Sequence, residues 1–246
     1  TRVFPYAGDR VRATQIDAIR PESIKGAVQS SDLVINCIGP YYRYGTIIAR
    51  AIIELGKSGV DICNNPGTTN GILSLDPMAK ELGVTMVTGA GFTPGLSNLL
   101  VMKAAYQMER IDDISIHWAS SIFQRGGESM LDHFLTMGAG DVPAYRNRLR
   151  TRVKAFSEPE SEKCRHPIGL TRVAHTGHPE VVTLPLYVDT NSVTVKGALL
   201  PGWLQQVEMD VDGPTGGIDA RRDEADACRQ HSIRVGIGDD PGGLAQ

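Results

Sequence analysis

The stretch "VINCIGPYYRYG", residues 34–45, gathers side chains that are suited to chemistry. An apolar run typical of a buried strand ends in a Gly39–Pro40 break, after which come three tyrosines and Arg43. In a parallel sheet, the loop after such a strand faces the ligand crevice. Aromatic side chains there can shield a reacting ring from water, and Arg43 can hold a carboxylate by a bidentate pair. The alternative is that the tyrosines, Tyr41 among them, only cap the core where strand meets helix.

A second stretch, "TGAGFTPGLSN" at residues 88–98, predicts a strand end, a glycine hinge and a helix that opens at Pro94. Gly91 and Gly95 permit close approach of the backbone to a ligand. Free N–H groups at the start of a helix favour an anion or a carbonyl oxygen. The alternative is a plain turn from strand to helix, but three glycines and a proline in so short a span favour a functional site.

Single polar residues give weaker signals. Asp17 ends the first expected strand and can accept a hydrogen bond from an adenine amino group, although Asp is also a natural turn residue. Asp61, in "DICNN", can contact a cofactor ribose or simply orient its own loop. His117 is a candidate proton donor, with a structural histidine as the alternative. The histidines lack metal spacing and the four cysteines form no C-x-x-C pair, so no metal site is expected.

Composition narrows the class of protein. The chain has 246 residues and a net charge of −3, which allows one large domain or two modest ones and predicts no nucleic-acid partner. No apolar run approaches the roughly 20 residues that span a bilayer, so no membrane partner is expected. The sequence shows no signal peptide. Cys37 and Cys63 lie in apolar strand runs and are expected to be buried, reduced thiols, which together predicts a cytoplasmic protein.

The first ninety or so residues alternate strand and helix signals, which predicts stacked βαβ units. The expected strands and helices there are, in order, strand 11–17, helix 21–30, strand 32–38, helix 46–56, strand 59–64, helix 73–83, strand 84–91 and helix 94–108.

The following segments read mostly as strands, including 112–121, 142–147, 151–156, 168–177, 180–188 and 192–200, with a helix over 128–138. The predicted fold class is therefore α/β, an incomplete doubly wound (Rossmann-like) parallel sheet plus a second α+β domain. We expect a partial dinucleotide-binding domain over 1–93, an α+β substrate or dimerisation domain over 94–204 and an irregular tail over 205–246.

The glycine-rich phosphate loop is missing from the sequence. No G-x-G-x-x-G lies between a strand and a helix, and no G-x-x-x-x-G-K-[ST] is present. In a dinucleotide fold that fingerprint belongs to the first βα turn, whereas this sequence opens on what reads as a later strand. Two expectations remain open: a missing amino-terminal unit, or a protein that never bound a pyrophosphate.

The segments "SDLVINCIGPYYRYG", "ARAIIELGKSGVDICNN" and "VTGAGFTPGLSNLL" together resemble the saccharopine dehydrogenase family, in its NADP-binding, saccharopine reductase-like branch. The resemblance covers roughly residues 9–204 and includes "HPEVVTLP" and "VTVKGALLPGW". It implies an NADP- or NAD-dependent oxidoreductase that acts on C–N bonds of small amino-acid-like substrates. It also implies a Rossmann domain joined to an α+β domain that binds substrate and mediates homodimerisation.

The resemblance also implies roles for particular residues. By resemblance, Cys37, Ile38, Gly39, Pro40 and Tyr41 line the cofactor, Gly91, Phe92, Pro94 and Gly95 lie at the interdomain active site, and Asp17 lies near the adenine. With the residues singled out above, the expected cofactor-binding residues are Asp17, Cys37, Ile38, Gly39, Pro40, Asp61, Gly91, Phe92, Pro94 and Gly95, and the expected catalytic residues are Tyr41, Arg43 and His117. Some members of the family have Asp where this chain has Thr93, so a carboxylate role is not transferred to that position.

Three functional hypotheses follow from the sequence. The first is an oxidoreductase in which hydride passes between NAD(P)H and an imine or secondary-amine carbon. The second is a catalytically silent scaffold or binding module that has lost its cofactor, which the missing phosphate loop favours. The third, a short-chain dehydrogenase, needs a Tyr-x-x-x-Lys pair; Tyr44 is followed by Ile48 and Tyr106 by Arg110 at that spacing, so it is set aside.

Overall fold

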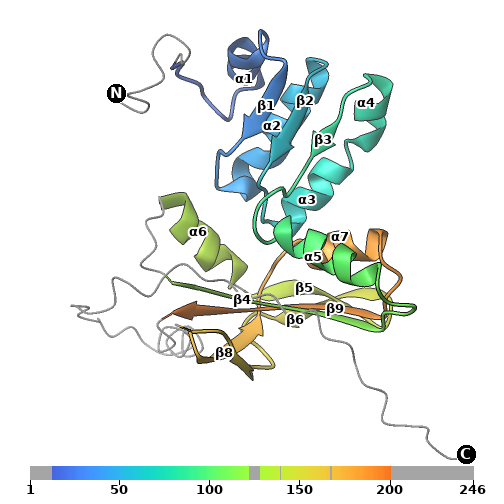
Figure 1. The fold of residues 1–246 in the computed structure, drawn as a ribbon. Coiled ribbons are helices and arrows are strands. Elements are labelled where there is room, and N and C mark those ends of the chain that lie inside the picture. The colour runs from blue at the N-terminus through green and yellow to red at the C-terminus, as the bar shows by residue number, and fades with distance from the viewer. Residues whose placement is uncertain (1–12, 122–127, 139, 167, 201–246) are drawn as a thin grey trace, which may run out of the picture.

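The computed structural model describes residues 13–121, 128–138, 140–166 and 168–200 of the chain. The tail predicted over 205–246 therefore lies outside the described residues. Two parts, each built on its own sheet, follow one another along the chain (Figure 1).

The first part is a parallel sheet of three strands, β1 (Leu33–Asn36), β2 (Ser58–Asp61) and β3 (Met86–Val87), hydrogen-bonded in that order. Helices connect them: α1 (Pro21–Val28) precedes β1, α2 (Tyr41–Glu54) joins β1 to β2, and α3 (Pro66–Leu73) and α4 (Asp76–Glu81) join β2 to β3. Parallel strands linked by helices are the Rossmann-like arrangement predicted for this segment, which is confirmed.

The position of α2 corrects one prediction. The three tyrosines do not form a loop, because the helix begins at Tyr41 directly after Pro40. Pro40 is the N-cap residue, with an extended backbone at ψ 138°, and the residues after it start the first turn. The helix ends at Glu54, and Gly56 then takes a φ of 64°, the left-handed conformation that glycine adopts readily past a helix end.

Two other predictions for this part differ from the structure. Residues 13–17 of the expected first strand form no strand and are largely exposed. Helix α3, which the sequence analysis did not predict, starts at Pro66, where the Asn65 side chain caps it by accepting a hydrogen bond from Thr68 N at 2.9 Å. Its glycines and threonines give a weak apolar pattern, which explains why the helix was missed.

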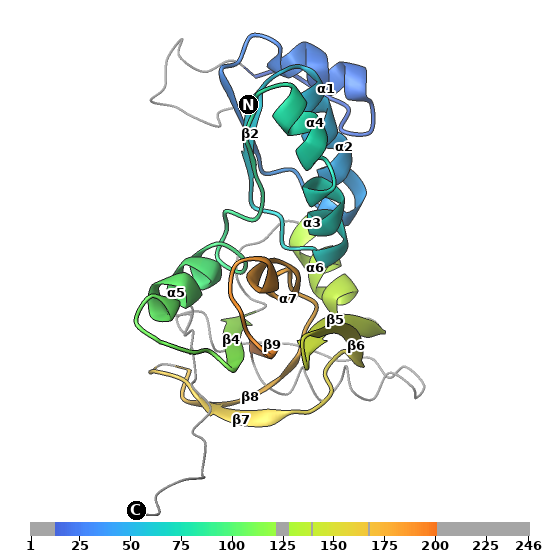
Figure 2. The ribbon, with the colours of Figure 1, turned by 90° about the vertical axis from the view of Figure 1, so that its right-hand side faces the viewer.

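The helices α1 to α4 cover only one face of this sheet (Figure 2). Val34 packs on that face beside Ile52, whereas Ile35 and Val87 on the other face are 68% and 49% exposed. Cys37, predicted to be buried, is exposed, because the chain has left β1 before it and no described residue covers it. Cys63 is buried as predicted.

The second part is a mixed sheet of six strands. Strand β9 is central: it pairs in parallel with β4 along its whole length and antiparallel with β5 and β8, while β6 and β7 form the edges. The elements are α5 (Leu96–Ala105), β4 (Asp113–Ser121), α6 (Glu128–Met137), β5 (Asp141–Arg146), β6 (Leu149–Lys154), β7 (Glu160–Lys163), β8 (Leu170–His175), α7 (Glu180–Thr183), a 3₁₀ turn η2 (Leu184–Leu186) and β9 (Ser192–Leu200).

Residues 180–188, predicted as a strand, instead form α7 and the 3₁₀ turn. The β-branched run there suggested a strand, but Val181, Val182 and Leu184 bury against the sheet from a helical turn, so tertiary packing overrides the local preference. Strand β7 was not predicted, because its sequence, Glu-Ser-Glu-Lys, has no apolar residue on either face.

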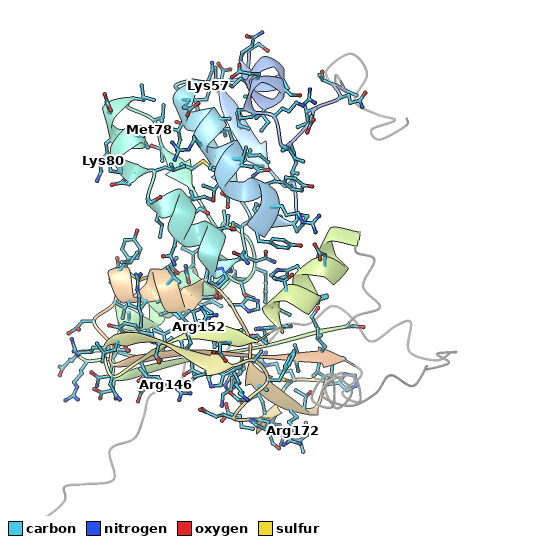
Figure 3. All side chains as sticks on the ribbon, turned by 180° about the vertical axis from the view of Figure 1, so that it is seen from behind. Lys57, Met78, Lys80, Arg146, Arg152 and Arg172 are labelled. Carbon is cyan, nitrogen blue, oxygen red and sulfur yellow. The ribbon has the colours of Figure 1, made fainter. Side chains whose placement is uncertain are left out.

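The two faces of this sheet differ sharply. Helices α5, α6 and α7 lie on the face turned towards the first part, where Ile116, Trp118 and Val195 form the main core (Figures 1 and 2). The opposite face carries charged side chains between β4, β9, β8 and β7, and Arg146 and Arg172 project on the side away from the first part (Figure 3). In the described part of the chain, no helix is long and apolar enough to cross a bilayer.

Candidate functional site at the junction of the two parts

Tyr41 connects the end of β1 to the end of β2. Its buried hydroxyl donates to the Asn36 carbonyl oxygen at 2.7 Å and accepts from Ile62 N at 3.3 Å. Burial raises the pKa of the Tyr41 hydroxyl, so it stays protonated and keeps both bonds. The residue predicted to touch substrate therefore holds the two strand ends together.

Asp61 connects β2 to the glycine hinge. Its buried Oδ1 accepts from Cys63 N at 2.8 Å, Gly89 N at 2.9 Å and Thr88 Oγ1 at 3.0 Å, and its backbone carbonyl accepts from Ala90 N at 2.7 Å. Three donors on one buried oxygen, together with the Ala90 contact, fix the loops around Asp61. Of the two alternatives raised from the sequence, the contacts support loop orientation.

The hinge itself is closed by backbone contacts that require glycine. Gly91 bridges to Gly95, whose φ of 118° is unusual for any residue with a side chain. A Cβ at Gly95 would lie 2.8 Å from the Gly89 carbonyl oxygen and closer still to Gly91. Gly95 is therefore needed for the tight packing of the hinge, whereas a Cβ at Gly91 would make only ordinary contacts, and α5 starts directly after Gly95.

Together these contacts join the two stretches that the sequence singled out. The tyrosine turn contacts the end of β2 through Tyr41, and the hinge contacts the same strand end through Asp61. Both stretches therefore lie at the carboxyl edge of the parallel sheet, where Rossmann-like folds bind their ligands.

The second part contributes a buried carboxyl group to this junction. Glu180, at the first position of α7, has no exposed surface, and its Oε1 accepts from Ser97 Oγ at 2.6 Å. One turn along, Asn98 Nδ2 donates to Thr183 Oγ1 at 3.1 Å. Burial raises the pKa of Glu180, which the Ser97 and Thr93 hydroxyls and its own backbone only partly offset. This favours the neutral carboxylic acid.

Two histidines lie beside it. The His178 ring contacts the Trp118 ring at 5.1 Å between centroids and the His133 ring, edge on, at 6.2 Å. Desolvation lowers the pKa of His178 to about 3 and that of His133 to about 4, so both are neutral at pH 7. Helix α6, which carries His133, also accepts a hydrogen bond from Tyr42 at 2.6 Å through Asp132 Oδ2.

Several residues of this junction carry a buried polar atom without a partner. Among the described residues, one buried side-chain N or O atom lacks a hydrogen bond in each of Asn36, Asp61, Thr93, Asn98, His178 and Glu180. Buried polar groups are almost always paired, so such a cluster indicates a place where a ligand completes the pairing.

These atoms fit the cofactor that the fold class implies. Asn36 Nδ2 is an unused donor at the end of β1, and Asp61 Oδ2 is an unused acceptor at the end of β2. A dinucleotide at the carboxyl edge presents hydroxyl and amide groups that match a donor and an acceptor in these positions.

The other predicted site residues are distributed as follows. Exposed Arg43 lies in the first turn of α2, over the Tyr42 ring at 5.5 Å. Asp17 is remote from the junction and forms a turn before α1, accepting from Ile19 N and pairing with Arg20. Ile38, Gly39, Pro40, Phe92 and Pro94 lie within the two stretches, and Cys37 follows β1 on the uncovered side.

His117 is not brought to the junction. It lies on the far face of β4, opposite to Trp118, with Nδ1 2.9 Å from Glu162 and Nε2 3.1 Å from Glu160. We therefore leave His117 out of the site proposed below. Glu180 and His178, which do reach the junction, were signalled in the sequence only by "HPE" before an apolar run, a pattern too short to single out without a fold.

A surface cavity of about 460 Å³ lies elsewhere, at the end of α5, and Tyr106, Arg110, Arg148 and Tyr187 are among its lining residues. None of the predicted site residues line it. Its two arginines are already paired, Arg110 with Asp112 and Arg148 with Asp189. We therefore place the candidate site at the junction.

A parallel sheet with its carboxyl edge facing a second, mixed-sheet part defines the class of Rossmann-type dinucleotide-binding proteins. The saccharopine dehydrogenase NADP binding domain model matches residues 2–87. The predicted relationship to the saccharopine dehydrogenase family is thereby confirmed, and so is the predicted cofactor type, NADP or NAD.

Curated relatives and a solved structure agree with this relationship. The saccharopine dehydrogenase-like oxidoreductase of Rattus norvegicus is 33% identical over 93 residues, 37% of this chain and 22% of the relative. The Homo sapiens protein of the same name is 28% identical over 145 residues, 52% of this chain and 34% of the relative. The chain thus spans about a quarter to a third of the curated relatives it matches.

The likeness in fold covers more of the chain. Apo saccharopine dehydrogenase (L-Glu forming) from Saccharomyces cerevisiae superposes with a TM-score of 0.56 at 11% identity, over 76% of this chain and 44% of that one. This match supports the predicted fold class across both parts.

Proposed function

We propose that the chain forms part of an NAD(P)-dependent oxidoreductase that transfers hydride at a C–N bond of an amino-acid-like substrate. The observation that carries the proposal is the cluster of unpaired buried polar atoms where the carboxyl edge of the Rossmann-like sheet meets α5 and α7. The matches to the saccharopine dehydrogenase family support the type of reaction.

In this proposal each part of the chain has a distinct task. The turn from Asn36 to Pro40 and the carboxylate of Asp61 would bind and orient the cofactor, which supplies the hydride when bound. The hinge from Gly91 to Gly95 would separate cofactor from substrate, with Phe92 excluding water. Arg43, exposed on α2, would pair with a substrate carboxylate, because a guanidinium binds that group through two parallel hydrogen bonds.

A homodimer, a cytoplasmic location and the domain limits 1–93 and 94–204 remain part of the same proposal. In the family resemblance, the second domain mediates both substrate binding and dimerisation.

Cofactor binding by Asn36 is the first test. In Asn36→Asp the oxygen that accepts from Ile38 N at 3.0 Å is retained, but the unused Nδ2 donor becomes a buried acceptor. We expect NADPH to bind the wild-type chain with a rise in its fluorescence, and the Asn36→Asp chain about tenfold or more weakly. The matched control is Asn64→Asp, the same change at a partly buried Asn in the next strand's turn, which should leave the Kd within about twofold.

The alternative is a catalytically silent scaffold, favoured by the missing G-x-G-x-x-G fingerprint. It predicts no change in NADPH fluorescence at any concentration of the wild-type chain. Equal Kd values for wild type and Asn36→Asp would instead show binding that does not use the end of β1.

A further inference from the structure

Strand β6 is an edge strand that carries a row of cations. It stands at the end of the second sheet, and β5 is its one strand partner in the described part of the chain (Figure 2). Basic residues occupy every second position of its sequence, LRTRVK, and are Arg150, Arg152 and Lys154. All three are exposed. An edge strand leaves alternate backbone N–H and C=O groups without a strand partner, so a further strand can be added there.

Acidic side chains of the described residues do not pair with this row of cations. Arg152 donates to the backbone carbonyl of Asp141. Within the described chain, neither Arg150 nor Lys154 forms an ion pair, whereas the two arginines before them each do. Tyr145 faces Arg150 in the register and packs against the main core, so the row lies on the face turned towards the first part, as Arg152 does in Figure 3. Three like charges on one face repel one another, and an acidic partner would relieve that repulsion.

The chain itself contains a segment with the complementary pattern. Cations alone would equally discourage pairing with other chains, but residues 207–212, VEMDVD, alternate apolar and acidic side chains. Strict alternation over six residues is typical of a strand. The segment follows the last described residue, Leu200, at the end of β9. The tail was expected to be irregular because it is rich in Gly and Asp, and this alternating segment is the exception within it.

We propose that residues 207–212 add to the free edge of β6 as a further antiparallel strand. In the register that matches the charges, each acid lies directly opposite a cation: Glu208 with Lys154, Asp210 with Arg152, and Asp212 with Arg150. Opposite charges that face each other across two strands stabilise the pair, and the backbone hydrogen bonds add to it. A shift of one residue would place apolar side chains opposite the cations, so the register is well specified. The proposal does not depend on the oxidoreductase function.

The registers show that the tail can reach this edge. Tyr145 of β5 faces Val193 of β9, and Lys154 of β6 faces Asp141 of β5. Both pairs of strands are antiparallel, so the last residue of β6 lies towards the carboxyl end of β9. Two strand spacings take about 10 Å, whereas residues 201–206 span up to roughly 20 Å when extended. The Pro-Gly pair that opens this linker favours a turn. The segment would thus enter at the Lys154 end and run antiparallel to β6.

Hydrogen exchange of the β6 amides, followed by NMR on the complete chain, tests the proposal. The N–H groups that point away from β5 should be protected in wild type. They should exchange at least about tenfold faster when all three acids of the segment are replaced by lysine. That variant is Glu208→Lys/Asp210→Lys/Asp212→Lys. The amides of β9 should exchange as in wild type, which shows that the sheet itself stays folded.

The matched control makes the same change of charge elsewhere in the same tail. It is Asp223→Lys/Glu224→Lys/Asp226→Lys, in a segment without strict alternation. This control should keep the wild-type protection of β6, because its acids have no place in the register. A loss of protection equal to that of the first variant would show a general effect of charge and overturn the pairing.

Exchange of charge within one pair tests the register. Arg152→Glu alone should lose protection, and Arg152→Glu combined with Asp210→Lys should restore most of it, because the two charges again attract. Arg152→Glu combined with Asp212→Lys, one pair further along, should not. Equal recovery from both combinations overturns the register.

Three outcomes overturn the docking itself. Outward-pointing β6 amides that exchange at unprotected rates in wild type would mean that the cations only guard an open edge. Protection that survives in the variant with three lysines would mean that something else covers β6. Protection that falls on dilution would assign the added strand to a second copy of the chain. Protection that is independent of concentration and lost in that variant alone supports the docking within one chain.

Discussion

At the scale of single residues, the junction is organised by side chains that bond to backbone. Tyr41 and Asp61 each satisfy backbone groups from two separate strand ends, so they fix the carboxyl edge before any ligand binds. Loops that hold a ligand gain from such preorganisation, because less conformational entropy is lost on binding. Tyr41, expected to be catalytic, thus supports the loops of the site through its backbone contacts.

Tyr41→Phe tests this role. The variant keeps the ring but removes the hydroxyl, which leaves the buried Asn36 carbonyl and the Ile62 N–H without their partner. We expect the free energy of unfolding to fall by about 1–3 kcal/mol, measured by urea denaturation. Tyr106→Phe, at a side chain that is 86% exposed, is the control and should change stability by less than about 0.5 kcal/mol. A Tyr41→Phe chain as stable as wild type would show that the hydroxyl does not hold the strand ends.

At the scale of elements, the far face of the second sheet carries its own charged network. Glu158, Glu160 and Glu162 occur at every second position and face basic groups on neighbouring strands: Arg146, His175, Lys196 and His117. Burial lowers the pKa of His175, whose Nε2 lies 3.0 Å from Arg146 and 3.2 Å from Glu158 Oε2. Arg146 also pairs with Glu158 at 2.6 Å. This row holds the β7–β8 hairpin against β9.

Glu158 gives the network a pH dependence. Its hydrogen bonds from Arg146 and His175 lower the pKa of its carboxyl to about 2 in the folded chain, below its usual 4.5. A carboxyl whose pKa is lower in the folded chain than in the unfolded chain stabilises the fold at pH values above the unfolded-state pKa. This contribution is lost as the pH falls through about 2. We expect Glu158→Gln to unfold at lower urea than wild type at pH 7, and the difference to shrink between pH 4.5 and pH 2.

Because Glu158 is half exposed, salt should also reduce that difference. Glu109→Gln, an exposed carboxyl at the end of α5, is the control and should track wild type at each pH. A Glu158→Gln curve parallel to wild type from pH 7 to pH 2 would exclude the coupling to Arg146.

The same elements show what sequence patterns can and cannot predict. The apolar runs of β1 and α2, and the alternation in β4 that puts Trp118 and His117 on opposite faces, follow directly from periodicity. The start of α2 at Tyr41 and the helical state of residues 180–188 were missed, because both depend on what the segment packs against. Glu180 was missed for the same reason: only the fold brings it to Ser97.

At the scale of the whole molecule, the Tyr42–Asp132 hydrogen bond connects the two parts. The Ser97–Glu180 and Asn98–Thr183 hydrogen bonds join α5 to α7 at the junction. The candidate site thus draws on both parts, and the family match over residues 2–87 covers the first of them. The parallel sheet of the first part is less completely covered than the second sheet. A parallel sheet is normally covered on both faces, and the described residues cover only one face of this one.

The uncovered face is an apolar row across all three strands. Ile35 pairs in register with Val60, and Val60 with Val87, so the three side chains lie side by side, with Leu33 and Ile62 at the margins. Ile35 is 68% exposed and Leu33 54%. Contiguous exposed apolar surface binds hydrophobic dyes and promotes association. We therefore expect the chain to enhance ANS fluorescence under native conditions.

Ile35→Thr combined with Val87→Thr should remove most of that enhancement, because it replaces two methyl-rich surfaces with hydroxyl groups while keeping β-branched strand residues. Leu99→Thr combined with Leu186→Thr is the control, since both leucines are exposed on helical segments outside this sheet. The control should keep the dye signal of wild type. Equal fluorescence from wild type and the Ile35/Val87 variant would mean that the face is covered in solution, by another part of the chain or by a second copy.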